Sequence, residues 1–454
     1  MTIIADILSS HSQILILGCG REGKSTYSYF RHLFPEKLIH IADENPEITG
    51  YNEFIRDNNI VFHTGDDCFM NLEVFDLIIK TPGIPLRKLN KVSKTVLTSQ
   101  TDLFLQQYFH QTTGVSGTKG KSTTASLLYH LYKESGRKVL LAGNIGIPVF
   151  DLISQITSDT EIIMELSAHQ GEILSRAPST MILLNIFQEH LDHFGDFSKY
   201  KNAKLNFCYR QAAGDTYIYY ADDPILKRCE KSVSGVTAVG ISSTSRSAEI
   251  YFSKEEIIGP GFHLQNPSCT LKGSHNLINI AAAVTAAVIG GVTPGQASGA
   301  LVTFTPLQHR LEYVGKVNDL IFYNDSISTV PEAAIAAMEA LENVQYIILG
   351  GYDRGIDYSQ LVEYLKERQQ ITALATGAAG KKISELALSA GITETRIITC
   401  NSMNECISFI TESDSVQGVC LLSPAASSYD RYKNFEERGE HFKELVSTIN
   451  GFTK

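Results

Sequence analysis

Two stretches of the sequence combine glycines, a lysine and a hydroxyl side chain, the groups that bind a nucleoside triphosphate. The first, GCGREGKST, begins at Gly18, and the second, GVSGTKGKSTTASLL, spans residues 114–128. In such loops glycines let backbone N–H groups converge on phosphate oxygens, the lysine adds positive charge, and the hydroxyl binds Mg²⁺. Only the first stretch fits G-x-x-x-x-G-K-[ST], because Val115 stands where the second needs a glycine.

The first loop also fits a dinucleotide pattern. Gly18, Gly20 and Gly23 give G-x-G-x-x-G, and Asp43 lies about 20 residues further on, at the end of the next expected strand. Taken alone, this loop could be a Rossmann-type nucleotide site, a second phosphate loop or a structural turn. An NAD-dependent oxidoreductase is therefore one candidate function.

The second loop supplies every group that phosphate binding needs. These residues are Gly117, Thr118, Gly120, Lys121, Ser122 and Thr123. Glu165 ends a hydrophobic segment further along the chain, and a carboxylate at the end of a strand beside such a loop is well placed to hold Mg²⁺. A salt bridge at a strand end explains Glu165 equally well on this segment alone.

A polar window offers more metal ligands. NIFQEHLDHFGDFSKYKNAKLNF contains Glu189, His190, Asp192, His193 and Lys204. No cysteine lies near the histidines and they are not spaced i, i+4, so a zinc site is not indicated. Oxygen ligands and one imidazole around a hard cation fit better, although a polar helix N-terminus also explains the window.

Apolar segments that end in polar loops alternate with helical segments along the chain. Strands leading into polar loops are expected in the segments 13–20, 37–44, 76–85, 138–146, 161–170, 179–195, 319–326, 344–355, 373–380, 396–400 and 418–428. This rhythm is typical of doubly wound α/β domains. We predict a Rossmann-like domain at 1–106, a central P-loop ATPase-like domain with a mostly parallel sheet at 107–304, and a Rossmann-like domain at 305–454.

Composition narrows the function classes. The net charge of −10 over 454 residues argues against nucleic acid as the main partner. Eight cysteines without C-x-x-C spacing favour a reduced, cytoplasmic protein. The longest apolar run, 278–292, is too short to span a bilayer, and the N-terminus shows no secretory signal, so no membrane insertion is expected.

In their order, the motifs resemble those of the Mur ligase family over nearly the whole chain. The matching segments are SGTKGKST, GNIG, MELSAHQ, NIFQEHLDHF with YKNAKLNF, GSHNLINIAAA, PLQHRLE, NDS and LLSPAASSYDRYKNFEERGEHF. The last segment, 421–442, is most similar to the branch that adds D-glutamate. Under this resemblance the second loop is the ATP site and the first is a cradle for a nucleotide sugar.

The resemblance implies an ATP-dependent ligase of peptidoglycan precursor synthesis. Such an enzyme joins glutamate to UDP-N-acetylmuramoyl-L-alanine through an acyl phosphate, by positioning and charge neutralisation. D-glutamate is expected, and an L-glutamate-adding variant is the alternative. ATP, two Mg²⁺ ions and CO₂, as a carbamate on Lys204, are the implied cofactors, and a monomer is expected. An oxidoreductase or a catalytically silent nucleotide-binding protein would leave Glu165, His190 and Lys204 unexplained.

The resemblance also assigns roles to residues. The implied catalytic residues are Lys121, His190 and Lys204. The implied metal ligands are Ser122, Glu165, His190 and Lys204. Outside its phosphate loop, the ATP site would be lined by Asn276, Asn279, Arg310 and Asp325. The nucleotide-sugar side would include Gly20, Asp43, Gly83, Asn144, Ser167 and His190, and the glutamate side Thr329, Arg354, Ser428 and Phe435.

Several positions depart from the family pattern. Ile327 and Arg354 each stand where the family has a lysine, and Tyr429 stands where it has a leucine. Arginine still pairs with a carboxylate in bidentate fashion, whereas isoleucine carries no charge. Arg21 and Glu22 replace an apolar and a hydroxyl residue in the first loop. Under the resemblance, the changes at residues 327, 354 and 429 fall in the amino-acid pocket, and those at residues 21 and 22 fall where the diphosphate would bind.

Overall fold

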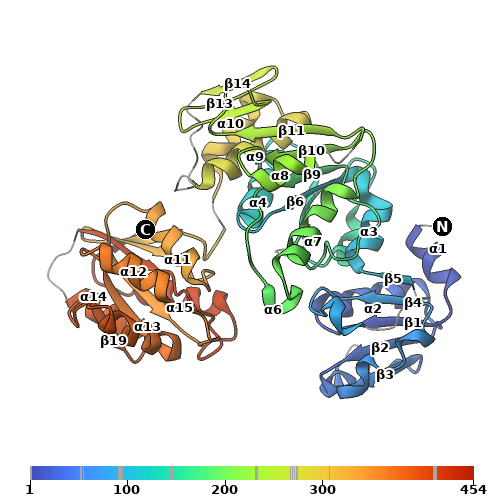
Figure 1. Ribbon diagram of the computed structural model, residues 1–454, viewed down its shortest axis with the longest axis horizontal. Coiled ribbons are helices and arrows are strands. Elements are labelled where there is room, and N and C mark those ends of the chain that lie inside the picture. The colour runs from blue at the N-terminus through green and yellow to red at the C-terminus, as the bar shows by residue number, and fades with distance from the viewer. Residues whose placement is uncertain are drawn as a thin grey trace. The chain divides into compact units, whose positions relative to one another are not determined.

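A computed structural model describes most of the chain. The described residues are 3–51, 54, 56–89, 96–143, 147–230, 234–265, 267, 269, 271, 273, 275–305, 307–412 and 417–454. Contacts divide the chain into two compact units, one of Met1–Cys269 and Leu277–Phe304 and one of Thr270–Asn276 and Thr305–Lys454 (Figure 1). Three separate sheets, each with helices packed on it, form these units.

The N-terminal sheet has five parallel strands in the order β3-β2-β1-β4-β5. Their bounds are β1 (Ile14–Leu17), β2 (Ile39–Asp43), β3 (Ile60–Thr64), β4 (Leu77–Lys80) and β5 (Val96–Thr98). The three strands expected in this part of the sequence are present. In β1 every residue is buried, as expected for a parallel strand covered on both faces.

The central sheet has nine strands in the order β14-β13-β12-β11-β10-β9-β6-β8-β7. The bounds are β6 (Thr112–Ser116), β7 (Val139–Gly143), β8 (Glu161–Glu165), β9 (Thr180–Leu183), β10 (Thr216–Tyr220), β11 (Thr237–Ser242), β12 (Ile250–Phe252), β13 (Glu256–Gly259) and β14 (Phe262–Gln265). Pairing is parallel from β7 to β12 and antiparallel from β12 to β14. The mostly parallel sheet is confirmed, and its antiparallel edge was not predicted.

Helices cover both of these sheets. Between residues 3 and 303 they are α1 (Ile3–Ser10), α2 (Arg21–Leu33), α3 (Gln100–Tyr108), α4 (Lys121–Glu134), α5 (Val149–Leu152), α6 (Leu191–Phe194), α7 (Phe197–Tyr209), α8 (Pro224–Glu230), α9 (His275–Ile289) and α10 (Pro294–Thr303). Short 3-10 helices are η1 (Pro46–Gly50), η2 (Gly65–Phe69), η3 (Leu72–Val74), η4 (Leu86–Lys88), η5 (Phe109–Gln111) and η6 (Ile153–Gln155). One hydrophobic cluster runs from Ile16 of β1 through Phe150 of α5 to Met164 of β8, so the two sheets share a core.

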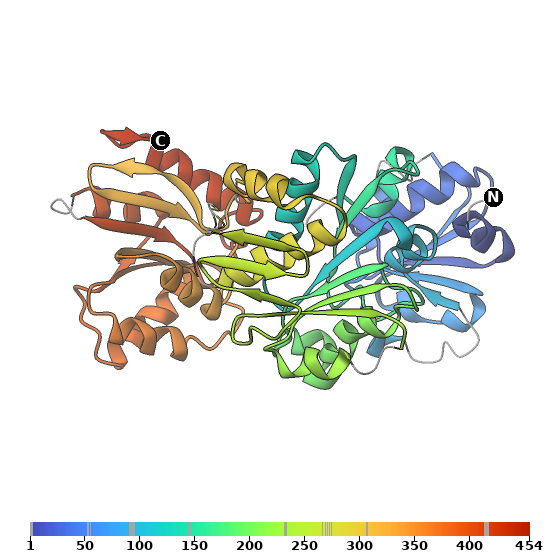
Figure 2. The same cartoon turned by 90° about the horizontal axis from the view of Figure 1, so that it is seen from above.

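The C-terminal sheet has seven strands in the order β19-β18-β17-β20-β16-β15-β21. They are β15 (Glu312–Val317), β16 (Leu320–Asn324), β17 (Val344–Gly350), β18 (Thr372–Thr376), β19 (Ile397–Cys400), β20 (Gly418–Leu422) and β21 (Phe452–Thr453). The helices of this unit are α11 (Pro331–Ala340), α12 (Ser359–Glu367), α13 (Gly377–Ser389), α14 (Met403–Glu412) and α15 (Phe435–Ser447) (Figure 2). β15 pairs antiparallel with both β16 and β21, and the other strand pairs described in this sheet are parallel.

Alternate residues of β17 show that this sheet is covered on both faces. Ile347 and Leu349 pack in the cluster of α11, α12 and α13, whereas Tyr346 and Ile348 pack in the cluster of α14 and α15. This is the doubly wound arrangement that the sequence predicts.

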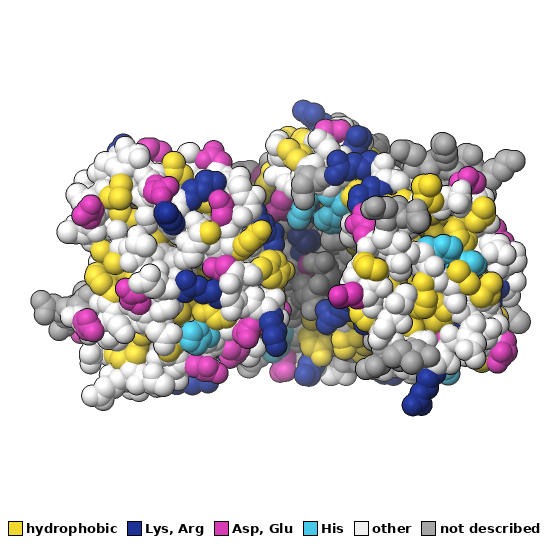
Figure 3. Space-filling view, turned by 90° about the horizontal axis from the view of Figure 1, so that it is seen from below, with side chains coloured by type: hydrophobic (Ala, Val, Ile, Leu, Met, Phe, Trp, Pro, Cys, Tyr) yellow, Lys and Arg dark blue, Asp and Glu magenta, His cyan; other side chains and the backbone are white. Residues whose placement is uncertain are grey.

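The surface charges and the hydropathy of the helices bear on binding to nucleic acid or membrane. Acidic and basic side chains are interspersed on the face of the C-terminal unit drawn in Figure 3. Within the described chain, no helix is both long enough and apolar enough to cross a membrane.

Candidate active site

The loop between β6 and α4 is shaped by its glycines. Gly117 has a φ of +152° and Gly120 a φ of +87°, both in the region that side chains disfavour. A Cβ on Gly120 would lie 2.3 Å from Oδ1 of Asn279. The loop therefore reaches the start of α4 in a conformation that glycine permits, and the helix dipole of α4 favours an anion there.

Lys204 of α7 lies against this loop. Its Nζ donates a hydrogen bond to the carbonyl of Gly117 at 2.7 Å, and the side chain is buried. Nζ of Lys121 donates to the carbonyl of Thr118 at 2.9 Å. Burial, and then the charge of Lys121, hold the pKa of Lys204 well below its usual range. The structure thus places two lysines at one phosphate loop, one of them in a site that disfavours its charge.

Glu165 ends β8 next to the same loop. β8 pairs with β6, with Val115 opposite Glu165, and Glu165 is 1% exposed. On its other side β8 pairs with β7, and a Cβ on Gly143 would lie 2.2 Å from the carbonyl of Glu165. The parallel register therefore brings the carboxylate to the carboxyl edge of the sheet, beside the loop.

Tyr200 of α7, the first residue of the YKNAKLNF segment, contacts this loop in a way that the sequence did not reveal. Its hydroxyl lies 2.9 Å from Oγ1 of Thr118, and both residues are buried. Thr118 also accepts a hydrogen bond from the N–H of Phe187 at 3.1 Å. Tyr200 is one turn before Lys204 on α7, so this bond joins the helix that carries Lys204 to the phosphate loop.

Tyr200→Phe is expected to lower the free energy of unfolding by about 1–2 kcal/mol, because a buried hydrogen bond is lost while the ring remains. Urea denaturation of the two proteins measures the difference. Unchanged stability would show that the Thr118 hydroxyl is fully satisfied by the backbone around Phe187.

The polar window after residue 185 contains the short helix α6. His190 precedes it with a left-handed backbone, φ +56°. Glu189 pairs with Lys119 of the phosphate loop at 2.6 Å, and His190 Nε2 lies 3.6 Å from Glu189. Residues held in this region of φ often belong to functional sites. The window therefore borders the phosphate loop, as its sequence suggested.

A buried ion pair, to which His193 of the same window adds a contact, connects the two sheets of the first unit. Nζ of Lys80, at the end of β4, lies 3.1 Å from Oε2 of Glu172, and Nε2 of His193 lies 3.2 Å from the same oxygen. The ring of His169 stacks edge-on against that of His193 at 4.3 Å. Burial, with the neighbouring His193 and His190, lowers the pKa of His169 to about 3. His169 is therefore neutral near pH 7.

In the first glycine loop, the hydroxyl of Ser25 and the amine of Lys24 contact other side chains of the protein. Oγ of Ser25 donates to Asp151 of α5 at 2.6 Å, and Ser25 is buried rather than solvated. Nζ of Lys24 lies 3.8 Å from the centre of the Tyr51 ring. A loop that uses its hydroxyl and lysine in this way does not resemble a Mg²⁺-binding phosphate loop. This observation favours the nucleotide-cradle interpretation over a second phosphate loop.

Asp43 closes the first loop from the next strand. Its Oδ2 accepts a hydrogen bond from the backbone N–H of Cys19 at 2.6 Å. A Cβ on Gly18 would lie 2.0 Å from Oγ1 of Thr81, and one on Gly23 would lie 2.0 Å from the carbonyl of Gly18. Gly20 precedes α2, and Gly83 is exposed in the turn after β4. Asn144, also predicted for this side, lies outside the described residues.

Glu22 and Ser167 meet through Gln170. Nε2 of Gln170 donates to Oε1 of Glu22 at 3.1 Å, and the N–H of Ser167 donates to Oε1 of Gln170 at 3.0 Å. Burial raises the pKa of Glu22 to about 7, although the hydrogen bond from Gln170 opposes that shift. Near pH 7 Glu22 is partly protonated, which reduces its repulsion of an anion at the first loop.

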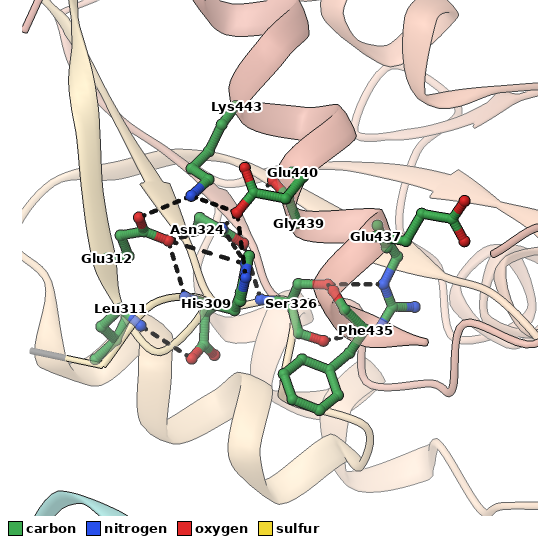
Figure 4. A network of polar contacts seen from close by, with 12 residues as sticks. His309, Leu311, Glu312, Asn324, Ser326, Phe435, Glu437, Gly439, Glu440 and Lys443 are labelled. Atoms are coloured by element: carbon green, nitrogen blue, oxygen red, sulfur yellow. Dashed lines mark hydrogen bonds and ion pairs between the residues drawn. The ribbon is translucent and has the colours of Figure 1, made fainter. Parts of the chain in front are cut away.

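In the second unit, Asp325 lies at the end of β16. It accepts hydrogen bonds from Ser328 at 2.5 Å, Ser423 at 2.7 Å and the N–H of Leu311 at 3.2 Å. Burial raises its pKa to about 6, and the hydrogen bonds and the charge of Arg310 oppose this shift. Figure 4 shows Leu311 and the neighbouring His309 at this network.

Two departures from the family pattern lie next to each other. The guanidinium carbon of Arg354 is 5.6 Å from the centre of the Tyr429 ring, a cation–π contact. Ser428 is buried beside Tyr429, Phe435 begins α15, and Thr329 precedes α11. All of these residues belong to the second unit.

Comparison with known proteins decides the family. Residues 115–287 match the family model described as Mur ligase middle domain. The UDP-N-acetylmuramoylalanine--D-glutamate ligase of Geobacillus kaustophilus is 34% identical over 397 residues, covering 83% of this chain and 84% of the relative. This chain belongs to the Mur ligase family. The ligase of the same name from Acetivibrio thermocellus is 29% identical and covers 97% of both chains.

Solved Mur ligases share the fold. The MurF ligase of Thermotoga maritima in complex with ADP has a TM-score of 0.60 at 15% identity, covering 96% of this chain and 95% of that one. MurC of Thermotoga maritima has a TM-score of 0.58 at 17% identity, covering 96% and 99%. Mur ligases are ATP-dependent amide ligases, and the three-domain α/β architecture predicted for this one is confirmed.

Within this Mur ligase, the described structure brings together Lys121, Glu165 and Lys204 around one loop. Asn279 joins them from α9, where its Oδ1 accepts a hydrogen bond from Thr124 at 3.2 Å. Asn276 is buried at the start of the same helix. Asn276 is counted with the second unit, which also contains Arg310, Asp325 and the residues predicted for the glutamate pocket. The roles assigned to all of these residues, and the three domain boundaries, stay predictions.

Proposed function

We propose that this enzyme joins glutamate to UDP-N-acetylmuramoyl-L-alanine at the expense of ATP. ATP phosphorylates the alanine carboxylate, the glutamate amine attacks the acyl phosphate, and phosphate leaves. The observation that carries the proposal is the buried amine of Lys204, 2.7 Å from the Gly117 carbonyl of the phosphate loop. The relatives named for this reaction, similar over most of the chain, support the same conclusion.

The phosphate loop would hold ATP through the backbone of residues 117–122 and the charge of Lys121. Ser122 and Glu165 would hold one Mg²⁺, and His190 with Lys204 a second. In the described part of the chain, no three His, Cys, Asp or Glu side chains gather to bind a metal. A site of hydroxyl, carboxylate and imidazole donors completed by phosphate oxygens fits Mg²⁺, which keeps few protein ligands. Bound Mg²⁺ would neutralise charge on the transferred phosphoryl group.

Lys204 would serve the metal only after reaction with CO₂, since an ammonium repels a cation. A carbamate forms when a neutral amine attacks CO₂ and releases a proton, and the product carries an anionic oxygen. The buried position of Lys204, beside the positive charge of Lys121, favours the neutral amine that this reaction needs.

The nucleotide sugar would bind at the first loop. Gly20 lies in this loop, Asp43 at the end of β2 and Gly83 in the turn after β4. Asp43 bonds to the loop through the N–H of Cys19, and Ser167 is linked to it through Gln170 and Glu22. Asn144 completes this set in the proposal. Eight free cysteines support synthesis in a reducing compartment such as the cytoplasm.

Arg354 and Tyr429 bear on which glutamate is used. In the proposal Arg354 pairs with a carboxylate of the incoming amino acid, while Thr329, Ser428 and Phe435 line the rest of the pocket. D-glutamate is the proposed substrate, because the relatives at 28–34% identity are named for it. The Arg354–Tyr429 contact is the observation that keeps L-glutamate as the alternative.

Phosphate release from ATP tests the proposal. We expect release only when UDP-N-acetylmuramoyl-L-alanine and glutamate are both present, with D-glutamate preferred over L-glutamate in parallel reactions. A preference for L-glutamate would reassign the amino acid and leave the ligase intact. No release with either enantiomer would refute the ligase reaction.

A further inference from the structure

Arg310 lies in a strained turn of the second unit. His309 before it has a φ of +62° and Leu311 after it a φ of +45°. Positive φ is uncommon for any residue but glycine, and although histidine adopts it more often than most, a bulky leucine there is an outlier. Such strain persists only where the surrounding contacts determine the conformation, and it gathers at ligand-binding sites.

Three backbone hydrogen bonds hold this turn. The N–H of His309 donates to Oε2 of Glu312 at 2.8 Å, and the N–H of Leu311 donates to Oδ1 of Asp325 at 3.2 Å. The carbonyl of His309 accepts from the N–H of Ile327 at 3.2 Å. The turn is thus fastened to both sides of the Asp325 loop.

The His309 ring adds a fourth hydrogen bond to those that hold the turn. The contacts of Asn324 determine which ring nitrogen of His309 carries the proton. The N–H of Ser326 donates to Oδ1 of Asn324 at 3.2 Å, so Nδ2 of Asn324 is the atom that faces His309. That amide donates to Nδ1 of His309 at 2.9 Å (Figure 4). Nδ1 is therefore an acceptor, and the ring proton is on Nε2, 3.5 Å from Oε1 of Glu440.

Helix α15 packs against the imidazole ring of His309. A Cβ on Gly439 would lie 2.1 Å from Nδ1 of His309, so only glycine fits there. Lys443 bridges Glu312 at 3.1 Å and Glu440 at 2.7 Å, as Figure 4 shows. His309 itself is 4% exposed. The imidazole is thus fixed by packing as well as by its hydrogen bond.

We propose that His309 is a positioning residue, which holds the turn so that Arg310 and Asp325 stay in place for the nucleotide. This inference rests on the proposed function and on the prediction from the family resemblance that Arg310 and Asp325 line the ATP site. The interaction that matters is the acceptor at Nδ1. Without it the amide of Asn324 keeps its hydrogen bond to Oε2 of Glu312 at 3.0 Å but no longer holds the His309 ring, so the strained turn can relax.

Two substitutions at His309 separate this role from simple packing. His309→Asn keeps an acceptor near the position of Nδ1, and asparagine tolerates positive φ. His309→Leu fills similar space without an acceptor and disfavours positive φ. We expect His309→Leu to weaken ADP binding to the full-length protein about tenfold, the loss of roughly one hydrogen bond to a charged group, and His309→Asn to bind within about threefold of wild type.

Calorimetric titration with Mg²⁺–ADP gives these affinities without requiring turnover, and steady-state kinetics adds a second readout. We expect the KM for ATP to rise in His309→Leu while kcat changes little, since the contact is made in ground and transition states alike. Lys316→Ala, which removes an exposed ion pair with Asp319 on the same unit, is the control that should bind ADP normally.

The measured ADP affinities distinguish failure of the positioning role from failure of the proposed function. Equal ADP affinity in His309→Leu and wild type would overturn the proposal, and so would equal losses in the two His309 variants. If His309→Leu does not fold, Gly439→Ala decides, because it displaces the ring while keeping the histidine; normal ADP affinity in that variant would also overturn the proposal. No ADP binding by wild type would instead refute the proposed function.

Discussion

Lys204→Ala is expected to lose ligase activity by a factor on the order of 10³, comparable to the loss of a group that stabilises transition-state charge. Lys204 is buried and its Nζ contacts the phosphate loop, so no neighbouring exposed side chain replaces it. The variant removes the donor to the Gly117 carbonyl and also the amine that would form the proposed carbamate. Phosphate release measured with all three substrates gives the loss directly.

Formate or acetate is expected to restore part of the activity of Lys204→Ala. Truncation to alanine leaves space where the lysine was, and a small carboxylate can supply the anionic oxygen that the carbamate would have provided. An amine such as ethylamine fills the same space with a positive charge and should not rescue. Rescue by the amine rather than the carboxylate would show that the lysine acts as a cation, without CO₂.

Lys199→Ala is the matched control on the same helix. Its ammonium forms an exposed ion pair with Asp196, and its side chain is 69% exposed. We expect wild-type activity for this variant, with or without carboxylates. Full activity of unsupplemented Lys204→Ala would contradict the carbamate role outright.

Several strands, and the glycine loop before α4, could be predicted because local sequence determines them, whereas the role of that loop in binding phosphate stays a prediction. Apolar segments that end in glycine or an acid gave β1, β2 and β8, and the residues following the second loop singled it out despite its imperfect pattern. A strict match would have chosen the first loop. The structure shows why that match misleads: the hydroxyl of Ser25 is used to join α2 to Asp151.

Contacts between distant segments could not be predicted. Tyr200 and Asn324 belong to the recognised segments YKNAKLNF and NDS, and Glu172 belongs to none, yet no sequence pattern pairs them with their partners. Only the fold brings Tyr200 to Thr118, Glu172 to Lys80 and Asn324 to His309. The antiparallel edge β12–β14 was missed for a related reason, since its three- and four-residue strands give too short a pattern. The motif containing His309 was recognised, yet the positive φ values that give the histidine its importance leave no mark in the sequence.

Lys80→Met is expected to lower the free energy of unfolding by about 3–5 kcal/mol, because it leaves the carboxylate of Glu172 buried without its cation. The side chains of Lys80 and Glu172 are 2% and 7% exposed, so water cannot solvate the remaining charge. Nζ of Lys80 also donates to the carbonyl of Ile84 at 2.7 Å, which ties the turn after β4 to this pair. Urea denaturation, followed in the transition of the first unit, measures the loss.

A double-mutant cycle separates the pair from the packing around it. Lys80→Met combined with Glu172→Gln removes both charges, and we expect the double variant to be more stable than the sum of the single losses predicts. Lys88→Met, which removes an exposed ion pair a few residues further along the chain, is the comparison. Its pair with Glu44 has side chains 39% and 58% exposed, so its loss should cost no more than about 1 kcal/mol.

The two ion pairs differ in burial and not in charge type, so the comparison isolates the effect of solvent. Equal losses for Lys80→Met and Lys88→Met would contradict the argument from burial. A small loss at Lys80 alone would indicate that His193, whose Nε2 lies 3.2 Å from the same Glu172 oxygen, stabilises the carboxylate in place of the lysine.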